Sequence, residues 1–300
     1  MVDPSGQSPV IAITLGDAAG VGPEVARAAL ASGRLDAGFR YRLIGSLAEG
    51  LEIGHPSEDS ARSALAALEE AAALARAGEV AAVVTGPIHK ARMQAIGFPF
   101  PGQTEFFANR WQSRDFAMLL TGGGLTVALV TAHVPLSQVA GLLTEAEIIR
   151  VGRLFADFLR LRTGRAPRIA VAGFNPHAGE DGVLGSEEGR IIAPAVRRLA
   201  AESAATWIGP LSPDTVFNRA VSGEFDGVLC MYHDQGLIPL KLHAFDKGVN
   251  VTLGLPHVRT SPDHGTAFEI AGTGRARPDS MIAAINLAAE LVRKRTAGPS

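Results

Sequence analysis

Residues 10–25 read Val-Ile-Ala-Ile-Thr-Leu-Gly-Asp-Ala-Ala-Gly-Val-Gly-Pro-Glu-Val, an apolar run that passes directly into a glycine-rich turn. The apolar run predicts a buried strand over Val10–Leu15, and Pro23 suits the first turn of a helix behind it. Such a turn offers free backbone N–H groups to an anion, but it is as often only a tight connection. The stretch is not GxGxxG and therefore predicts a strand–turn–helix unit without a Rossmann fingerprint.

Apolar runs and amphipathic stretches alternate along the rest of the chain, which is the pattern of a mostly parallel sheet with helical crossovers. Further strands are expected at Tyr41–Ile44, Val80–Val84, Leu125–Thr131, Arg168–Ala172, Gly227–Met231 and Val249–Thr252. Helices are clearest at Ser60–Ala77, Glu145–Leu161, Glu187–Ala201 and Asp279–Lys294. The predicted fold class is α/β, doubly wound.

The length of the chain, 300 residues, exceeds the usual size of one hydrophobic core, so we expect two α/β lobes. No internal repeat, low-complexity tract or long linker marks a boundary. Pro99 and Pro101 interrupt regular structure, which favours a crossing of the chain there. We expect a first lobe of residues 1–98 plus 255–300 and a second lobe of residues 99–254.

The charge balance and the single cysteine exclude several classes of protein. The 28 basic and 30 acidic residues give a formal charge of −2, so nothing favours binding to nucleic acid or an anionic membrane. Cys230 lies in an apolar run and is typical of a core residue, and one cysteine cannot form a disulfide within the chain. Neither a signal-peptide pattern nor the roughly 20 apolar residues of a membrane span occurs, so we expect a cytoplasmic protein.

Three histidines each stand where a predicted strand gives way to a polar turn: His133 in TAHVPL, His177 in NPHAGE and His233 in MYHDQG. One such histidine is more often structural, but parallel strands gather ligands at their carboxyl ends, so three can converge on one ion. Three imidazoles leave coordination positions open to a substrate. The sequence therefore predicts a catalytic divalent metal.

Further polar residues surround the third of these histidines. Asp234 and Gln235 follow it directly, and Lys241, Asn250 and Arg259 continue the region. A lysine and an arginine together suit an anionic substrate, although each could separately be a surface charge. The adjacent pair His89-Lys90 is more simply solvent-facing. The stretch that begins at Arg259 and contains a fourth histidine, His264, is a loop on composition alone.

In these and further motifs the chain resembles the PdxA family, the 4-hydroxythreonine-4-phosphate dehydrogenases of pyridoxal phosphate biosynthesis. The resemblance runs from Ile11 to about Leu291 and is carried by LGDAAGVGPEV, TGPIHK, GQTEFF, TAHVPL, GFNPHAGEDGVLGSEE, GPLSPDTVF, MYHDQGLIPLK and GVNVTLGLPHVRTSPDHGTAFEIAG. It implies two α/β/α lobes of the isocitrate and isopropylmalate dehydrogenase type, which bind NAD without a Rossmann fingerprint. The resemblance favours NAD, but the residues leave NADP open.

The resemblance also implies functional positions and a homodimer whose subunits share each active site. The implied metal ligands are His133, His177 and His233, for zinc, cobalt, nickel, manganese or magnesium. The implied substrate positions are Gln103, Thr104, Lys241, Asn250 and Arg259, with acidic positions at Asp214 and Asp234. The implied cofactor segment is Asp263, His264, Gly265, Thr266 and Ala267, around the adenosine.

The implied reaction is oxidation of a secondary alcohol by hydride transfer to NAD, followed by loss of carbon dioxide to give 3-amino-2-oxopropyl phosphate. The metal would stabilise the negative charge that develops on the oxygen. Lys241 and Arg259 would hold the phosphate and the carboxylate, in an order that the sequence does not decide. Asp234 is the hypothetical proton acceptor.

Two departures point to a second substrate class. Gln103 stands where biosynthetic members typically have histidine, and glutamine cannot carry a positive charge. The stretches 238–242 and 245–250 look at least as much like catabolic relatives that oxidise 4-phospho-D-threonate or 4-phospho-D-erythronate. A metal-dependent hydrolase or aldolase, or a non-enzymatic metal-binding scaffold, is the alternative from another class, and NAD binding would discriminate them.

Overall fold

The computed structural model describes residues 8–47 and 50–297, and the chain forms two compact units. Unit 1 extends to Arg114 and resumes at Val249, and unit 2 comprises Asp115–Gly248. The sequence analysis expects these limits at residues 98 and 254, and only the first of them rests on Pro99 and Pro101. Among the described residues, no helix has the length and apolar character to span a membrane.

Unit 1 contains five strands in the order β2-β1-β3-β10-β9. The first four are mutually parallel, and β9 runs antiparallel to β10. The strands are β1 (Val10–Thr14), β2 (Arg40–Ile44), β3 (Ala82–Thr85), β9 (Val249–Leu253) and β10 (Val258–Pro262). The helices are α1 (Gly22–Ala31), α2 (Glu58–Arg76), α3 (Lys90–Ala95), α4 (Gln103–Arg110), η4 (Phe268–Ile270) and α10 (Asp279–Ala297).

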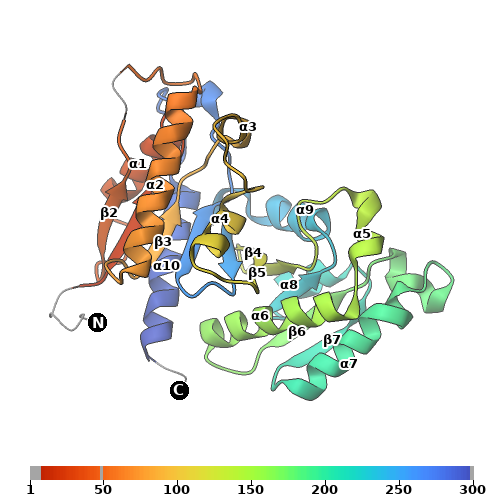
Figure 1. Ribbon diagram of the computed structural model, residues 1–300. Coiled ribbons are helices and arrows are strands. Elements are labelled where there is room, and N and C mark those ends of the chain that lie inside the picture. The colour runs from red at the N-terminus through yellow and green to blue at the C-terminus, as the bar shows by residue number, and fades with distance from the viewer. Residues whose placement is uncertain (1–7, 48–49, 298–300) are drawn as a thin grey trace. The chain divides into compact units, whose positions relative to one another are not determined.

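Small side chains let the helices of unit 1 approach its sheet closely. Helix α2 begins with a capping box between Ser57 and Ser60, which satisfies the first free N–H groups of the helix. Its buried face is mainly alanine, including Ala64 and Ala71, and packs on β1 and β3. In Figure 1 the helix lies in front of the strands of unit 1. Ile11 and Ile13 of β1 are fully buried, which explains the apolar run that predicts this strand.

Unit 2 contains the strand order β4-β5-β8-β6-β7. The strands β5, β8, β6 and β7 are parallel, and β4 pairs antiparallel with β5 through the two-residue turn Gly123-Gly124. Both glycines have positive φ, 58° and 87°, as a tight hairpin turn requires. The strands are β4 (Ala117–Gly122), β5 (Leu125–Leu129), β6 (Arg168–Ala172), β7 (Thr206–Leu211) and β8 (Gly227–Cys230).

The helices of unit 2 are α5 (Leu136–Leu142), α6 (Glu145–Thr163), η1 (Pro176–Gly182), η2 (Glu188–Ile192), α7 (Ala193–Glu202), α8 (Val216–Val221), α9 (His233–Ala244) and η3 (Phe245–Lys247). Leu237 and Leu240 of α9 pack in one apolar cluster with Val127 of β5 and Val228 of β8. This packing fixes the first turn of α9, where His233 stands, against the strand ends.

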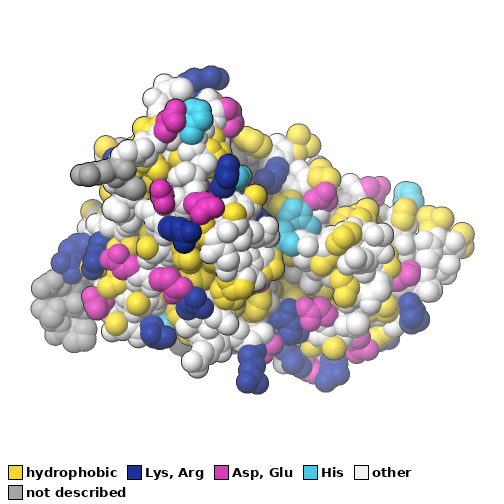
Figure 2. Space-filling view, turned by 45° about the horizontal axis from the view of Figure 1, so that its top comes forward, with side chains coloured by type: hydrophobic (Ala, Val, Ile, Leu, Met, Phe, Trp, Pro, Cys, Tyr) yellow, Lys and Arg dark blue, Asp and Glu magenta, His cyan; other side chains and the backbone are white. Residues whose placement is uncertain are grey.

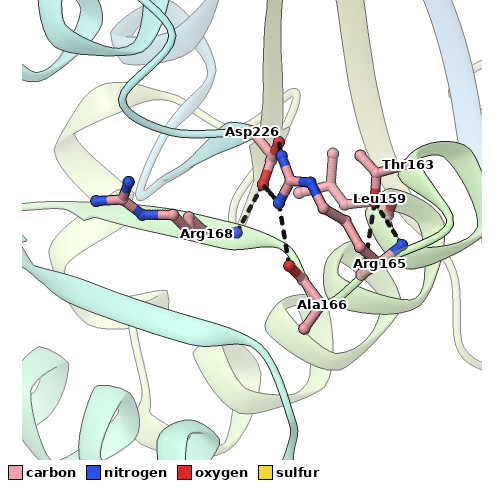
Figure 3. Close-up of polar contacts among 6 residues, drawn as sticks. All are labelled: Leu159, Thr163, Arg165, Ala166, Arg168 and Asp226. Carbon is pink, nitrogen blue, oxygen red and sulfur yellow. Dashed lines mark hydrogen bonds and ion pairs between the residues drawn. The ribbon is translucent and has the colours of Figure 1, made fainter.

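A single carboxylate joins the starts of two neighbouring strands of unit 2. Asp226, directly before β8, accepts hydrogen bonds from the backbone N–H of Arg168, at 2.7 Å, and from the guanidinium of Arg165, at 2.6 and 3.0 Å (Figure 3). The Arg168 bond lies at the first residue of β6. Asp226 therefore helps to set the β6–β8 register on which the strand ends depend.

The α/β class predicted from the sequence is confirmed, but several polar elements were missed. Strands β4, β7 and β10 were not predicted, and neither were helices α3, α4, α5, α8 and α9. The expectation of a loop at Arg259 was wrong, because residues 258–262 form the buried strand β10. Its polar side chains find hydrogen-bond partners inside unit 1, so the strand is buried without an apolar pattern.

Candidate active site

Arg259 of β10 is a buried cation that donates hydrogen bonds to uncharged side chains. Its side chain is 3% exposed and donates to the hydroxyl of Thr85 at 2.6 Å, the amide oxygen of Gln103 at 3.2 Å, and Thr252 and Asn250 at 3.3 and 3.4 Å. Its Nε has no partner among the described residues. Burial lowers the pKa of Arg259 to about 10, opposed by the charge of Glu105, so the group stays positive near neutral pH.

A buried positive charge with neutral partners is costly unless an anion completes the site. The arrangement around Arg259 therefore fits an anion-binding site. Four of the five predicted substrate residues contribute to it: Gln103, Asn250 and Arg259 directly, and Thr104 through a 3.3 Å contact with the hydroxyl of Thr252. The fifth, Lys241, belongs to α9 of unit 2.

Gln103 occupies the first turn of α4 and is oriented by two hydrogen bonds. Its Nε2 donates to the carbonyl oxygen of Gly86 at 3.0 Å, while its Oε1 accepts from Arg259. The amide thus has its oxygen toward the cation and its nitrogen toward a carbonyl. A neutral side chain fills this role at every pH near neutrality.

The three predicted metal histidines follow three adjacent parallel strands of unit 2, β5, β8 and β6. The rings of His133 and His233 lie together, with centroids 5.6 Å apart. Both line a hollow of about 250 Å³ with Thr131, Tyr232 and Asp234. Asp234 Oδ1 lies 2.7 Å from His233 Nδ1, so a neutral His233 ring carries its proton on Nδ1 and has Nε2 as its acceptor nitrogen.

His177 lines a different, more open hollow of about 900 Å³. Within residues 8–47 and 50–297, no group of three histidine, cysteine, aspartate or glutamate side chains could hold a metal ion. The described chain therefore brings two of the three predicted ligands together and does not add the third. Asp214, near His177, has its pKa lowered chiefly by a hydrogen bond from Ser212.

His177 stands in an uncommon left-handed turn that sequence reasoning missed. Residues 177–181 all have positive φ, between 44° and 82°, although only Gly179 is a glycine. This conformation costs about 1–2 kcal/mol for each non-glycine residue. Such strain persists where the surroundings impose it, and it is common at functional sites.

Glu188 of η2 holds the start of this turn. Its buried carboxylate accepts from the backbone N–H groups of Phe174 and Asn175, both at 2.7 Å, and from the Asn175 amide at 2.9 Å. The sequence carries no signal for this role, because only the structure shows that Glu188 is buried. The Asn175 amide also donates to Glu187, which lowers the pKa of that carboxyl.

The predicted cofactor segment packs on the glycine-rich turn after β1. The backbone N–H of Val21 donates to the carbonyl of Thr266 at 2.9 Å, and the N–H of Asp263 bonds Ser280 at 3.2 Å. A Cβ atom on Gly20 would lie 2.6 Å from the Thr266 oxygen, so this approach requires glycine. His264 keeps one buried nitrogen, Nε2, without a partner in the described structure. These features fit a bound dinucleotide.

The surface of unit 2 carries exposed apolar side chains, while its charges are mixed. The large exposed apolar side chains lie mainly on and beside three helical segments. They are Leu136 and Leu142 of α5, Val183 and Leu184 after η1, and Ile238, Leu242 and Phe245 along α9 and η3. Figure 2 shows acidic and basic side chains interspersed on the face in view. Exposed apolar residues at helical spacing are typical of a protein interface.

Residues 25–288 match the model of the family described as "Pyridoxal phosphate biosynthetic protein PdxA". The chain belongs to the PdxA family. It is 49% identical to the 4-hydroxythreonine-4-phosphate dehydrogenase of Bradyrhizobium diazoefficiens, over 82% of this chain and 72% of that protein. It is 39% identical to the D-threonate 4-phosphate dehydrogenase of Pectobacterium atrosepticum, over 95% of this chain and 99% of that protein.

Solved structures agree with the PdxA assignment. The 4-hydroxythreonine-4-phosphate dehydrogenase of Klebsiella pneumoniae superposes with a TM-score of 0.80 at 38% identity, covering 95% of this chain and all of that one. A β-decarboxylating dehydrogenase of Thermococcus kodakarensis superposes with a TM-score of 0.54 at 19% identity, covering 96% of this chain and 84% of that one. At this identity the likeness shows a shared fold alone. The expected fold of the isocitrate and isopropylmalate dehydrogenase type is thus confirmed.

Proposed function

We propose that this PdxA-family chain is an NAD-dependent and divalent-metal-dependent dehydrogenase. Its substrate is 4-phosphohydroxy-L-threonine, which it oxidises and decarboxylates to 3-amino-2-oxopropyl phosphate. The observation that carries the proposal is the anion-binding site around Arg259, a buried cation whose hydrogen-bond partners include the uncharged Thr85 and Gln103. The chain that holds it is 49% identical to a 4-hydroxythreonine-4-phosphate dehydrogenase. A phosphorylated hydroxy acid supplies the anions that such a site requires.

The residues of each unit have separate roles in this proposal. Arg259 binds one anionic group of the substrate, and Gln103 and Asn250 hold its guanidinium in place. Lys241 provides the second cation, on α9. His133, His177 and His233 would hold the metal, and the 263–267 segment would hold NAD.

The donor set fits a divalent ion, because two imidazoles face one hollow and Asp234 orients one of them. When bound, the metal supplies Lewis acidity toward the substrate oxygen and NAD accepts the hydride. Since the described chain pairs only two of the ligands, we propose that His177 completes the site across a homodimer. The exposed apolar residues of unit 2 support such an assembly.

Leu242→Glu is expected to weaken the proposed dimer. Ile238, Leu242 and Phe245 are 64%, 88% and 75% exposed and share one side of α9 and its continuation. Burying a glutamate from both protomers in place of leucine should raise the dimer dissociation constant about a hundredfold or more. Light scattering during size-exclusion chromatography measures the change, and Leu47→Glu in unit 1 is the matched control. A Leu242→Glu dimer as stable as the wild type would refute this interface.

Asp234→Asn is expected to lower kcat about ten- to hundredfold. The asparagine can still accept from His233, so the ring stays in place, but the negative charge that would take up or direct a proton is gone. Steady-state rates across pH should show an altered profile as well as a lower maximum. Asp157→Asn, an exposed carboxylate on α6, is the control. Normal turnover with an unchanged pH profile would remove Asp234 from proton transfer.

A second candidate, oxidation of 4-phospho-D-threonate or 4-phospho-D-erythronate, is favoured by Gln103. Its amide is already engaged by Gly86 and Arg259, so it brings no ionisable group to the substrate. The 39% identical D-threonate 4-phosphate dehydrogenase shows that the family includes such enzymes. Comparing kcat/KM for the amino substrate and the two hydroxy acids tests the choice: preference for a hydroxy acid would replace the biosynthetic proposal.

A further inference from the structure

Five buried side-chain atoms of unit 1 have no hydrogen-bond partner among the described residues, and three of them lie away from Arg259 and its neighbour Glu105. These three are Asp17 Oδ2 in the turn after β1, His89 Nδ1 after β3, and His264 Nε2 after β10. Asp17 is only 1% exposed. Native proteins rarely leave buried polar atoms unpaired, so three in neighbouring segments indicate that a bound group supplies their partners. The sequence analysis expects His89 to face solvent, and this expectation is wrong for Nδ1, which is buried.

The three segments are held against one another through their backbones. Asp17 N–H donates to the carbonyl of Pro87 at 2.8 Å, and the neighbouring turn bonds Thr266. The His89 ring meets Phe268 edge-on, with centroids 5.2 Å apart. A Cβ on Gly16 would lie 2.3 Å from the Pro87 oxygen, so a side chain there would force the segments apart. The three segments that carry the unpaired atoms therefore form one cradle of residues 16–22, 86–89 and 263–268.

The chemistry of the cradle specifies its ligand. Asp17 Oδ1 already accepts from the N–H of Ala19 at 3.1 Å, and an ionised carboxylate can only accept, so Oδ2 awaits a donor. His264 Nδ1 lies 3.0 Å from the carbonyl of Gly265, which places its proton on Nδ1 and leaves Nε2 as an acceptor. Two acceptors suit a group with two adjacent donors. The vicinal hydroxyls of a ribose are such a group, whereas a phosphate offers none.

We infer that Asp17 and His264 bind the two hydroxyls of the adenosine ribose, with His89 beside them, and that this contact selects NAD over NADP. The inference rests on the proposed function, because it assumes that a dinucleotide binds unit 1. A 2′-phosphate would replace a donor by negative charge next to the Asp17 carboxylate, which repels it. Asp17 is thus a specificity-determining residue in a turn without the Rossmann fingerprint.

Asp17→Asn tests the inference by direct binding, without turnover. The asparagine oxygen can keep the bond from Ala19, while its amide nitrogen removes the charge and the second acceptor. Calorimetric titration should show NAD⁺ affinity about tenfold weaker, a smaller difference between NAD⁺ and NADP⁺, and a melting temperature unchanged or higher. Asp59→Asn, the same change at an exposed position of α2, should alter none of these.

The outcomes separate a binding role from a structural one. If Asp17→Asn binds NAD⁺ as the wild type does, or loses NAD⁺ and NADP⁺ affinity equally with a lowered melting temperature, the inference fails. Should this variant not fold, His264→Phe removes the other acceptor, and unchanged NAD⁺ affinity there would overturn the inference equally. A wild-type protein that does not bind NAD⁺ at all would overturn the proposed function, and the inference with it.

Discussion

Arg259→Met is expected to raise KM for the phosphorylated substrate about a hundred- to thousandfold while leaving NAD⁺ affinity nearly unchanged. Removing one member of a buried charge pair costs about 3–5 kcal/mol, because the substrate anion would then be buried unpaired. Methionine retains much of the arginine volume and packs beside Phe107, over which the guanidinium now lies. The melting temperature of the free protein should therefore hold or rise.

The matched control for this variant is Arg295→Met in the same unit. Arg295 donates to the carbonyls of Pro256 and Leu255, and burial lowers its pKa as it does that of Arg259. Its loss should reduce stability and leave KM alone. If Arg259→Met kept the wild-type KM, or lost activity only in step with a lower melting temperature, Arg259 would be structural and the proposed anion-binding site would be wrong.

His233→Ala is expected to abolish stoichiometric metal binding and lower kcat about a thousandfold, since losing about 4 kcal/mol of charge stabilisation corresponds to that factor. The ring shares a hollow with that of His133, and the Asp234 carboxylate orients it. Metal content by mass spectrometry and single-turnover rates measure the two effects.

His243→Ala provides the comparison on the same helix. His243 is exposed, and its Nε2 contacts the carbonyl of Gly123 in the β4–β5 turn, so it has a local structural role. Its replacement should leave metal content and kcat near wild type. Equal metal content in His233→Ala and the wild type would exclude the proposed metal centre at α9.

The strand-end histidines were predictable because their strands are apolar and parallel. β5 and β8 pair directly, with Leu129 opposite Cys230, so residues just beyond them are neighbours by topology. His177 follows the next strand, β6, but the left-handed turn directs it into another hollow. No periodicity encodes that turn, because it depends on hydrogen bonds to Glu188, thirteen residues after Asn175.

The proposed anion-binding site was only partly predictable from the sequence. The resemblance supplied Gln103, Asn250 and Arg259, yet composition gave a loop at Arg259 because a buried strand with arginine, threonine and serine has no apolar pattern. Asp17 and His89 were not predicted as binding residues, because each is singled out only by a buried polar atom that has no hydrogen-bond partner in the described structure. That property becomes visible only when the turns after β1, β3 and β10 are packed together.

The central claim is that the chain oxidises and decarboxylates a phosphorylated hydroxy amino acid with NAD⁺. The most direct measurement follows NADH and carbon dioxide together as metal-loaded wild-type protein acts on 4-phosphohydroxy-L-threonine, with metal-free protein and NADP⁺ in parallel. We predict equal amounts of the two products, dependent on metal and on NAD⁺. Metal-loaded protein that binds the substrate but forms no NADH, or forms as much without metal, would contradict the account.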